Sequence, residues 1–347
     1  MANIDREQPP LFDLGARPTT RGVAERVRAA GVDGLPDAVR RGDGARYQDV
    51  VCRTALNRVE GMPFGWTLNP YRGCTHGCHY CFARRYQPQL EMDSGDEFSS
   101  VVLVKVNFPD VLRTELARRT WDDELVAFGT ATDPYQPIEG RYRLTRRSLE
   151  ILAARATPVG LLTRGPLAVR DADVLADLTR RSRSTVTFSI PTVDEEAWER
   201  LEPGTAPPRQ RLRAVRTLND AGVDTGVLMA PIVPGITSHP AKLERTVREI
   251  AAHGATCVGT MLMHLEGGTR QHFLGFLRRE YPHLVEGYGR LYAGKHADPD
   301  YGRRFRAVMS ALTARHGGQV ERGRAPAARP REASRPEPGP AQPRFRL

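Results

Sequence analysis

The sequence contains no long apolar run and no N-terminal leader pattern. No segment reaches about 18 consecutive uncharged apolar residues, the length that a membrane-spanning helix needs. Asp5, Arg6 and Glu7 lie where the apolar part of a secretory signal would be. We therefore expect a cytoplasmic protein with no membrane partner.

Lysine is scarce in a chain that is otherwise basic. Only Lys105, Lys242 and Lys295 are lysines, although Lys and Arg number 51 against 41 Asp and Glu, for a formal charge of +10. Clustered cations can neutralise nucleic-acid phosphates, but GC-rich coding also enriches arginine. Part of the charge lies in the Pro- and Arg-rich segment 318–347, which lacks the apolar residues of a core. We predict that this segment is a disordered basic tail.

Cysteine is also infrequent, and its spacing argues against a disulfide framework. The chain has five cysteines, an odd number. Cys74, Cys78 and Cys81 lie within eight residues of one another, whereas Cys52 and Cys257 are isolated. Such a cluster in a long chain favours a reducing compartment and a metal site.

From Trp66 onward, short apolar runs alternate with longer amphipathic stretches. This alternation is typical of parallel strands joined by helices. The expected strands are 67–70, 125–129, 159–163, 185–190, 226–232 and 257–264, with a peripheral strand at 101–106. The expected helices are 109–118, 145–155, 172–181, 208–221 and 242–253.

Six such strands joined by right-handed crossovers predict an α/β fold, a partial (β/α)6 TIM-like barrel. A doubly wound open sheet has the same local pattern, and periodicity does not separate the two. We expect four parts: a loosely structured N-terminal arm at 1–60, the barrel at 61–266, a helical C-terminal extension at 267–317, and the tail. The extension carries aromatic and leucine residues every three or four positions, which indicates a core-facing stripe.

The cysteines follow the first expected strand in the segment NPYRGCTHGCHYCFARR, residues 69–85, with spacing C-x3-C-x2-C. Three neighbouring thiolates suit either zinc or an iron–sulfur cluster. A structural zinc ion needs a fourth protein ligand, for which His76, His79 and Cys52 are the candidates. No second pair of cysteines with C-x2-C spacing occurs elsewhere in the chain.

This spacing, with an aromatic residue just before the third cysteine, resembles the radical S-adenosylmethionine (SAM) superfamily. The segments GTATDPYQPIE at 129–139, LLTRG at 161–165 and APIVPG at 230–235 look like the branch that contains spore photoproduct lyase. The resemblance implies a [4Fe–4S] cluster on Cys74, Cys78 and Cys81, whose fourth iron binds SAM. It also implies reductive cleavage of SAM to a 5′-deoxyadenosyl radical, which takes hydrogen from an unidentified substrate.

The resemblance further implies partners and SAM-contacting residues that follow the barrel strands. Flavodoxin or ferredoxin is the expected electron donor, and nucleic acid is a candidate substrate of a lyase or oxidoreductase type of enzyme. Arg164 would pair with the SAM carboxylate, and Asp133 either accepts from the SAM ammonium or begins a turn. The implied SAM-binding residues are Tyr80, Thr130, Thr132, Asp133, Arg164, Ser189, Pro231 and Ile232.

For several other polar residues, position along the chain alone indicates a role. We expect Tyr135, Gln136 and Glu139 to face the barrel mouth as substrate-side residues. Glu202 either meets the substrate or belongs to a solvated salt-bridge cluster with Arg209 and nearby arginines, and the second alternative is favoured.

One departure separates the chain from spore photoproduct lyase itself. That enzyme uses a downstream cysteine as hydrogen donor, and no cysteine occurs here between Cys81 and Cys257. An alternative of another class is a non-catalytic zinc or iron–sulfur interaction protein with a nucleic-acid-binding basic tail.

Overall fold

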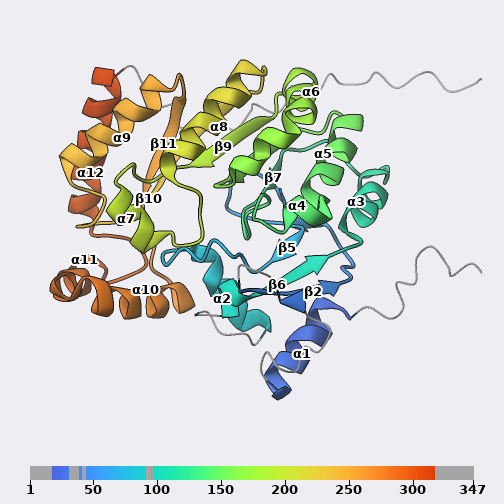
Figure 1. The fold of residues 1–347 in the computed structure, drawn as a ribbon, viewed down its shortest axis with the longest axis horizontal. Helices are drawn as coiled ribbons and strands as arrows, with labels where there is room; N and C mark the ends of the chain where they lie inside the picture. The colour runs from blue at the N-terminus through green and yellow to red at the C-terminus, as the bar shows by residue number, and fades with distance from the viewer. Residues whose placement is uncertain (1–17, 31–38, 41–43, 91–94, 96, 317–347) are drawn as a thin grey trace, which may run out of the picture.

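The structure is a computed structural model that describes residues 18–30, 39–40, 44–90, 95 and 97–316. It contains a seven-stranded sheet with helices along its outer side, and a separate four-stranded sheet. Figure 1 shows both sheets.

The larger sheet has the strand order β11-β10-β9-β8-β7-β4-β3. Its neighbours pair in parallel from β4 to β11, and only β3 pairs antiparallel with β4. Each of the six expected strands falls on one of these parallel strands, with ends that differ by at most two residues. The strands are β3 (Leu56–Arg58), β4 (Trp66–Leu68), β7 (Val126–Phe128), β8 (Val159–Thr163), β9 (Thr185–Ser189), β10 (Thr225–Ile232) and β11 (Thr256–Leu262).

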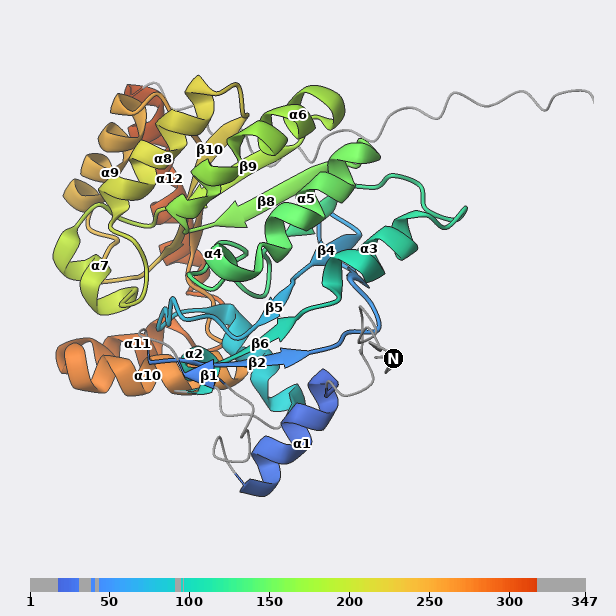
Figure 2. The ribbon, with the colours of Figure 1, turned by 45° about the vertical axis from the view of Figure 1, so that its right-hand side comes forward.

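Helices connect the parallel strands and cover the outer side of the sheet (Figure 2). Leu212, Val215 and Leu218 recur on one face of α8 and are buried, because this face packs toward the sheet. The five expected helices all occur, again with small shifts at their ends. The helices of this region are α3 (Phe108–Leu116), α4 (Glu139–Tyr142), α5 (Leu144–Ala154), α6 (Ala172–Ser182), α7 (Glu195–Leu201), α8 (Pro208–Asp220) and α9 (Pro240–Ala252), with the 3₁₀ helix η3 (Pro166–Asp171).

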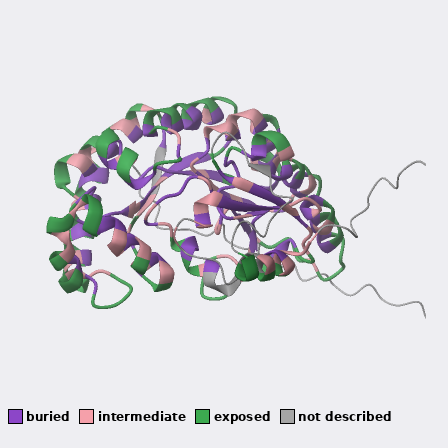
Figure 3. Cartoon of the chain, turned by 60° about the horizontal axis from the view of Figure 1, so that its bottom comes forward, coloured by how far each residue is buried: buried purple, intermediate pink, exposed green. Residues whose placement is uncertain are grey.

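Six parallel strands with helices outside them form the expected partial TIM-like barrel. The core lies between the strands and these helices, and Figure 3 shows buried strands inside and exposed helix faces outside. Since all six strands run the same way, the loops that follow them meet at one end of the sheet.

The smaller sheet has the order β1-β2-β6-β5. It shows that the segment expected to be a loose N-terminal arm is more regular than expected. Within its described part, Arg46–Val50 pairs in parallel with Val101–Lys105, and β3 extends the larger sheet. The elements are α1 (Thr20–Ala30), β1 (Val39–Arg40), β2 (Arg46–Val50), β5 (Tyr71–Arg72), α2 (Glu97–Ser100), β6 (Val101–Lys105) and the 3₁₀ helix η2 (Phe82–Leu90).

The C-terminal part is helical, as expected. Phe273, Phe276, Tyr288 and Tyr292 are buried in a cluster that also contains Tyr80, which confirms the core-facing stripe. The helices are α10 (Gly267–Glu280), α11 (Val285–Leu291) and α12 (Pro299–His316), with the 3₁₀ helix η4 (Pro282–Leu284).

The predicted basic tail at 318–347 lies outside the described residues. Among the helices that the structure does describe, none has both the length and the apolar character required to cross a membrane. The division into four parts remains a prediction.

Candidate functional site

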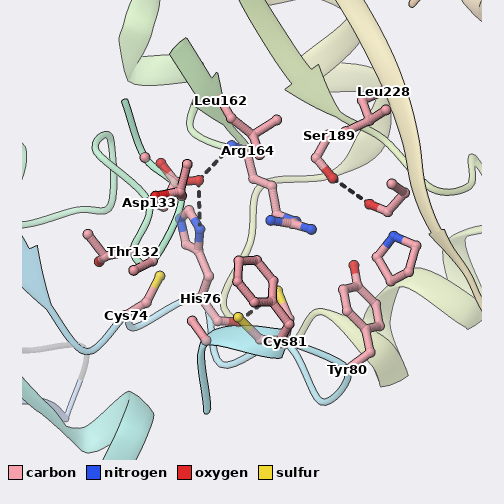
Figure 4. A pocket seen from close by; sticks show the side chains of 18 of the residues that line it. Cys74, His76, Tyr80, Cys81, Thr132, Asp133, Leu162, Arg164, Ser189 and Leu228 are labelled. Atoms are coloured by element: carbon pink, nitrogen blue, oxygen red, sulfur yellow. Dashed lines mark hydrogen bonds and ion pairs between the residues drawn. The ribbon is translucent and has the colours of Figure 1, made fainter. Parts of the chain in front are cut away.

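A pocket lies where the loops after the parallel strands meet (Figure 4). It collects residues from the loop after β4 and from the ends of β7, β8, β9, β10 and β11. Most of the expected site residues line it. These are Cys74, Cys78, Tyr80, Cys81, Thr130, Thr132, Asp133, Arg164, Ser189 and Pro231.

The three cysteines are free thiols on the wall of this pocket. Cys74 and Cys78 are buried, and Cys81 is half-buried. Burial raises the pKa of Cys78 and of Cys81, and the positive charge of Arg164 opposes this rise. Three thiols beside a half-buried cation are a donor set that suits an anionic iron–sulfur cluster.

The candidate fourth ligands for zinc are occupied otherwise or lie elsewhere. His79 Nδ1 is 2.9 Å from His272 Nε2, and Cys52 does not line the pocket. In the part of the chain that the structure describes, no three His, Cys, Asp or Glu side chains could together hold a single metal ion. Figure 4 shows Cys74 and Cys81 on the loop that lies below Arg164 in this view.

Close backbone contacts shape the loop that carries the cysteines. Gly73 has a φ of +80°, and a Cβ there would lie 2.2 Å from the carbonyl oxygen of Val101. Only glycine fits this position without strain. At the other end of the loop, the hydroxyl of Thr269 in α10 donates to the carbonyl oxygens of Cys81 and Phe82, at 3.1 and 3.3 Å.

Asp133 is buried and already bound by protein groups. Its carboxylate accepts from the Tyr135 amide at 2.8 Å, from the Thr163 hydroxyl at 2.6 Å and from the Arg164 amide at 2.6 Å. It also lies 3.3 Å from His76 Nδ1. These bonds support the turn-forming alternative for Asp133, which holds the start of the β7 loop against the end of β8.

Asp133 and His76 form a charged pair beside Cys74. Burial alone raises the pKa of Asp133, but the positive charge of His76 outweighs burial and lowers it to about 2. Burial lowers the pKa of His76, whereas the charges of Cys74 and Asp133 raise it to about 10. The pair therefore carries opposite charges at neutral pH.

Arg164 extends from the end of β8 into the pocket, next to the ring of Tyr80 (Figure 4). Its guanidinium carbon lies 5.8 Å from the centre of that ring. Burial lowers the pKa of Arg164, but the electrostatic influence of Tyr80, Cys78 and Glu202 outweighs burial and raises it. A half-buried arginine with this charge can bind a carboxylate in the pocket.

Two expected SAM-binding hydroxyls line the pocket, whereas only one of the two expected apolar residues does. Ser189 Oγ donates to the Ala230 carbonyl oxygen at 2.7 Å, and Thr132 Oγ1 donates to the Gly73 carbonyl oxygen at 2.7 Å. Pro231 lines the pocket, but Ile232 is fully buried in the core behind it and does not. The expectation that Ile232 forms part of the pocket wall is therefore wrong.

Glu202 is not solvated, which corrects the favoured alternative of the sequence. It is 3% exposed and directly follows α7. Its carboxylate pairs with Arg211 and with Arg164 Nε, and accepts from the Tyr80 hydroxyl. Burial alone raises the pKa of Glu202, but the charges of the two arginines outweigh it and lower the pKa to about 2.

Tyr135, Gln136 and Glu139 do not face the pocket, contrary to expectation. All three are buried, and none lines it. The Tyr135 hydroxyl donates to Asp171 at 3.1 Å, and Glu139 pairs with Arg170 at 2.9 Å. These bonds join Tyr135 and Glu139 to the 3₁₀ helix η3, outside the pocket lining.

Several pocket residues were not expected. Met261 lies near the end of β11 and His264 follows the strand, and their place at the end of the last strand is a signal that could have identified them. Phe98 comes from α2, beside the smaller sheet, and nothing in its local sequence marks it. Phe82 and Met261 are 43% and 45% exposed, so the pocket has an apolar mouth.

Comparisons with known proteins agree with the geometry. A family model described as the radical SAM superfamily matches residues 68–248. An uncharacterised protein of Mycobacterium bovis is 40% identical over 278 residues, which cover 79% of this chain and 82% of that protein. A Pseudomonas phage M6 protein named radical SAM Nalpha-GlyT isomerase is 28% identical over 172 residues, 49% of this chain and 34% of that protein.

The fold is similar to that of spore photoproduct lyase. A structure of that enzyme complexed with dinucleoside spore photoproduct has a TM-score of 0.58 to this one, at 17% identity. The match covers 78% of this chain and 79% of that chain. The expected resemblance in fold is confirmed.

Proposed function

The chain belongs to the radical SAM superfamily, and from this premise we propose that its pocket holds SAM beside a cluster on Cys74, Cys78 and Cys81. Enzymes of this superfamily use a [4Fe–4S] cluster and SAM. An electron from the cluster breaks a carbon–sulfur bond of SAM, giving methionine and a 5′-deoxyadenosyl radical that takes a hydrogen atom from the substrate. The observation that carries the proposal is that three free thiols and a half-buried arginine line one pocket.

The remaining pocket residues position SAM and exclude water. Arg164 binds the carboxylate of SAM, and Tyr80 packs against its adenine. Ser189 keeps an acceptor lone pair available for the ribose, because its proton is donated to Ala230. Phe98 lies on the apolar wall, and a dry wall of this kind protects a radical from side reactions.

The test is anaerobic reconstitution with iron and sulfide, followed by dithionite and SAM. We expect wild type to form 5′-deoxyadenosine and Cys78→Ala to form neither the brown cluster nor the product. Cys52→Ala is the matched control, because Cys52 is a free cysteine away from the pocket, and it should behave as wild type. Product formation by Cys78→Ala would contradict the proposal. Reduced flavodoxin or ferredoxin should replace dithionite.

We propose nucleic acid as the substrate class. The chain carries a formal charge of +10. The pKa of His264, which lines the pocket, is lowered, first by its partial burial and then by the nearby His296, Lys295 and Arg85. Exposed Phe82, whose ring centre lies 5.7 Å from the Arg85 guanidinium, offers a surface on which a base can stack. The similar lyase was solved in complex with dinucleoside spore photoproduct, which supports the same class.

Salt dependence tests the substrate class. The affinity for single-stranded and for duplex DNA should fall steeply with salt, with a log–log slope that reports the number of phosphates contacted. A flat dependence, or binding by the isolated tail sequence alone, would count against nucleic acid at this pocket. The alternative of a non-catalytic interaction protein predicts that reconstituted wild type makes no deoxyadenosine.

A further inference from the structure

Glu202 is the centre of a buried network on one side of the pocket. Its carboxylate contacts the Tyr80 hydroxyl, Arg164 Nε at 3.3 Å, and Arg211. It also accepts from the Thr205 hydroxyl at 3.3 Å. Glu202 does not itself line the pocket, although Tyr80 and Arg164 do. Whatever Glu202 does for the pocket, it therefore does through these two residues.

The backbone next to Glu202 is bound to the loop that carries the cysteines. The Gly204 amide donates to the His76 carbonyl oxygen at 3.1 Å, and the His79 amide donates to the Leu201 carbonyl oxygen at 3.0 Å. A Cβ on Gly204 would lie 2.1 Å from the Thr75 carbonyl oxygen. The Glu202 carboxylate thus keeps a fixed place relative to the cysteines.

Arg164 is held at two points and free at its end. Its amide donates to Asp133 at 2.6 Å, and its Nε donates to Glu202. Among the described residues, none accepts a hydrogen bond from the two Nη atoms of Arg164. Figure 4 shows the guanidinium group extending into the space between Asp133, Ser189 and Tyr80.

The charges of the network are unequal. Glu202 carries one negative charge, and both Arg164 and Arg211 contact it. Arg211 is fully buried and also donates to the carbonyl oxygens of Ser189 at 3.0 Å and Ala206 at 2.8 Å. The second positive charge therefore resides on Arg164, where an incoming anion can meet it.

We propose that Glu202 is a positioning residue, which directs the Nη edge of Arg164 at the carboxylate of SAM and so makes the pocket selective for that carboxylate. The proposal rests on the proposed function of the pocket. An arginine has many rotamers, and fixing Nε leaves two parallel N–H donors that match a carboxylate. Fixing them before the ligand arrives reduces the entropy lost on binding.

The test compares two ligands on Glu202→Gln after reconstitution, by equilibrium dialysis without any reductant. Glutamine keeps the size of the side chain but removes its charge. We expect SAM to bind about tenfold more weakly, the loss of roughly one charged hydrogen bond. Decarboxylated SAM should bind as it does to wild type, because it lacks the carboxylate that Arg164 meets. Iron content should be unchanged.

Glu139→Gln is the matched control. Glu139 is also a fully buried carboxylate with an arginine partner, but it lies outside the pocket lining. Its glutamine variant should bind both ligands as wild type does. If Glu202→Gln folds poorly, Glu202→Asp retains the charge beside Arg211 and should show the same selective loss, to a smaller degree.

A double variant separates positioning from general stability. Arg164→Ala should remove the preference for SAM over decarboxylated SAM, and adding Glu202→Gln to it should weaken SAM binding no further. Additive losses, or equal weakening of both ligands by Glu202→Gln, would overturn the inference while leaving the proposed function intact. Wild type that assembles no cluster or binds no SAM would overturn the proposed function, and this inference with it.

Discussion

Two buried carboxylates of this molecule, Glu139 and Glu202, have nearly the same chemical surroundings and very different positions. Each accepts from a tyrosine hydroxyl and pairs with arginine, and both follow parallel strands of the same sheet. We name the two groups the remote network and the pocket network. The remote network is Tyr71, Glu139, Arg146, Arg170 and Asp171, and the pocket network is Tyr80, Arg164, Glu202, Thr205 and Arg211.

The networks differ in whether their positive and negative charges balance one another within the protein. In the remote network, Arg170 pairs with Glu139 at 2.9 Å and with Asp171 at 2.7 Å. Arg146 also pairs with Asp171 at 3.3 Å, so two arginines face two carboxylates. In the pocket network, Glu202 faces two arginines, and Arg164 reaches open space. The comparison teaches that burial and ion pairing alone do not mark a functional site, whereas an unbalanced charge beside a pocket does.

The largest expected effect breaks the remote network. Glu139→Ala removes the side-chain acceptor of the Tyr71 hydroxyl and the Thr145 amide, and it leaves Arg170 with a single ion-pair partner, Asp171. We expect it to lower the free energy of unfolding by about 3 kcal/mol, measured by urea denaturation. Deoxyadenosine formation per cluster-loaded molecule should not change. A loss of that activity in cluster-loaded protein would show that the remote network contributes to the function of the pocket.

A second expectation concerns pH and sharpens the role of the pocket network. The pKa of Glu202 is about 2 in the folded protein, below the value of about 4.3 for an unfolded glutamate. The unfolded chain therefore takes up protons first as pH falls. The contribution of Glu202 to the free energy of unfolding is fully present above about pH 5 and is lost as the pH falls from there toward 2. Unfolding curves should depend less steeply on pH in Glu202→Gln than in wild type.

Asp173→Asn is the control for this pH effect. Its carboxylate also has a pKa of about 2, mainly because of its hydrogen bonds with Arg146, but its side chain is 65% exposed. Its contribution should vanish in about 1 M salt, because salt screens exposed charges much more than buried ones. A pH dependence of wild type that also vanishes in salt would contradict a buried origin at Glu202.

The smallest expected effect lies at the rim of the pocket. Arg85 and Glu266 form an ion pair at 2.8 Å, with side chains 39% and 48% exposed. Arg85→Gln should change the free energy of unfolding by no more than about 0.5 kcal/mol. A shift in the urea midpoint as large as that of Glu139→Ala would remove the contrast between exposed and buried pairs.

The barrel was predictable because its signals are local. The run Val159–Thr163 is apolar, bounded by Pro158 and Gly165, and forms β8 at the expected residues. Helix ends were equally clear, since Gly222 and Gly254 follow α8 and α9 closely. The cysteine spacing identified the centre of the pocket for the same reason.

The rest depended on contacts between distant residues. Nothing near Glu202 in the sequence indicates that Tyr80 and Arg164 surround it. The sequence therefore predicts a solvated salt-bridge cluster of Glu202 with Arg209 and nearby arginines. Glu139 was placed at the mouth from its position after β7, although the loop turns its side chain inward. Ile232 ends β10 beside a pocket residue, and only the register of the strand places it in the core.

Of the smaller sheet, the sequence predicts β6, as the peripheral strand at 101–106, but not the strands that pair with it. Its strands are short, and Arg46–Val50 contains Arg46, Gln48 and Asp49. It becomes a strand by pairing with β6, more than 50 residues later in the sequence. Single-residue patterns cannot show such a pairing, because the apolar partner supplies the burial that the segment lacks.

The hydrogen bond from Thr269 to the Cys81 carbonyl has a consequence for the order of synthesis. Its two residues are 188 positions apart. The ribosome therefore releases the cysteine loop long before it makes the helix that fastens the loop from the other side. Since contacts so distant in sequence form late, the corner that holds the three thiols is completed only when the C-terminal helices dock.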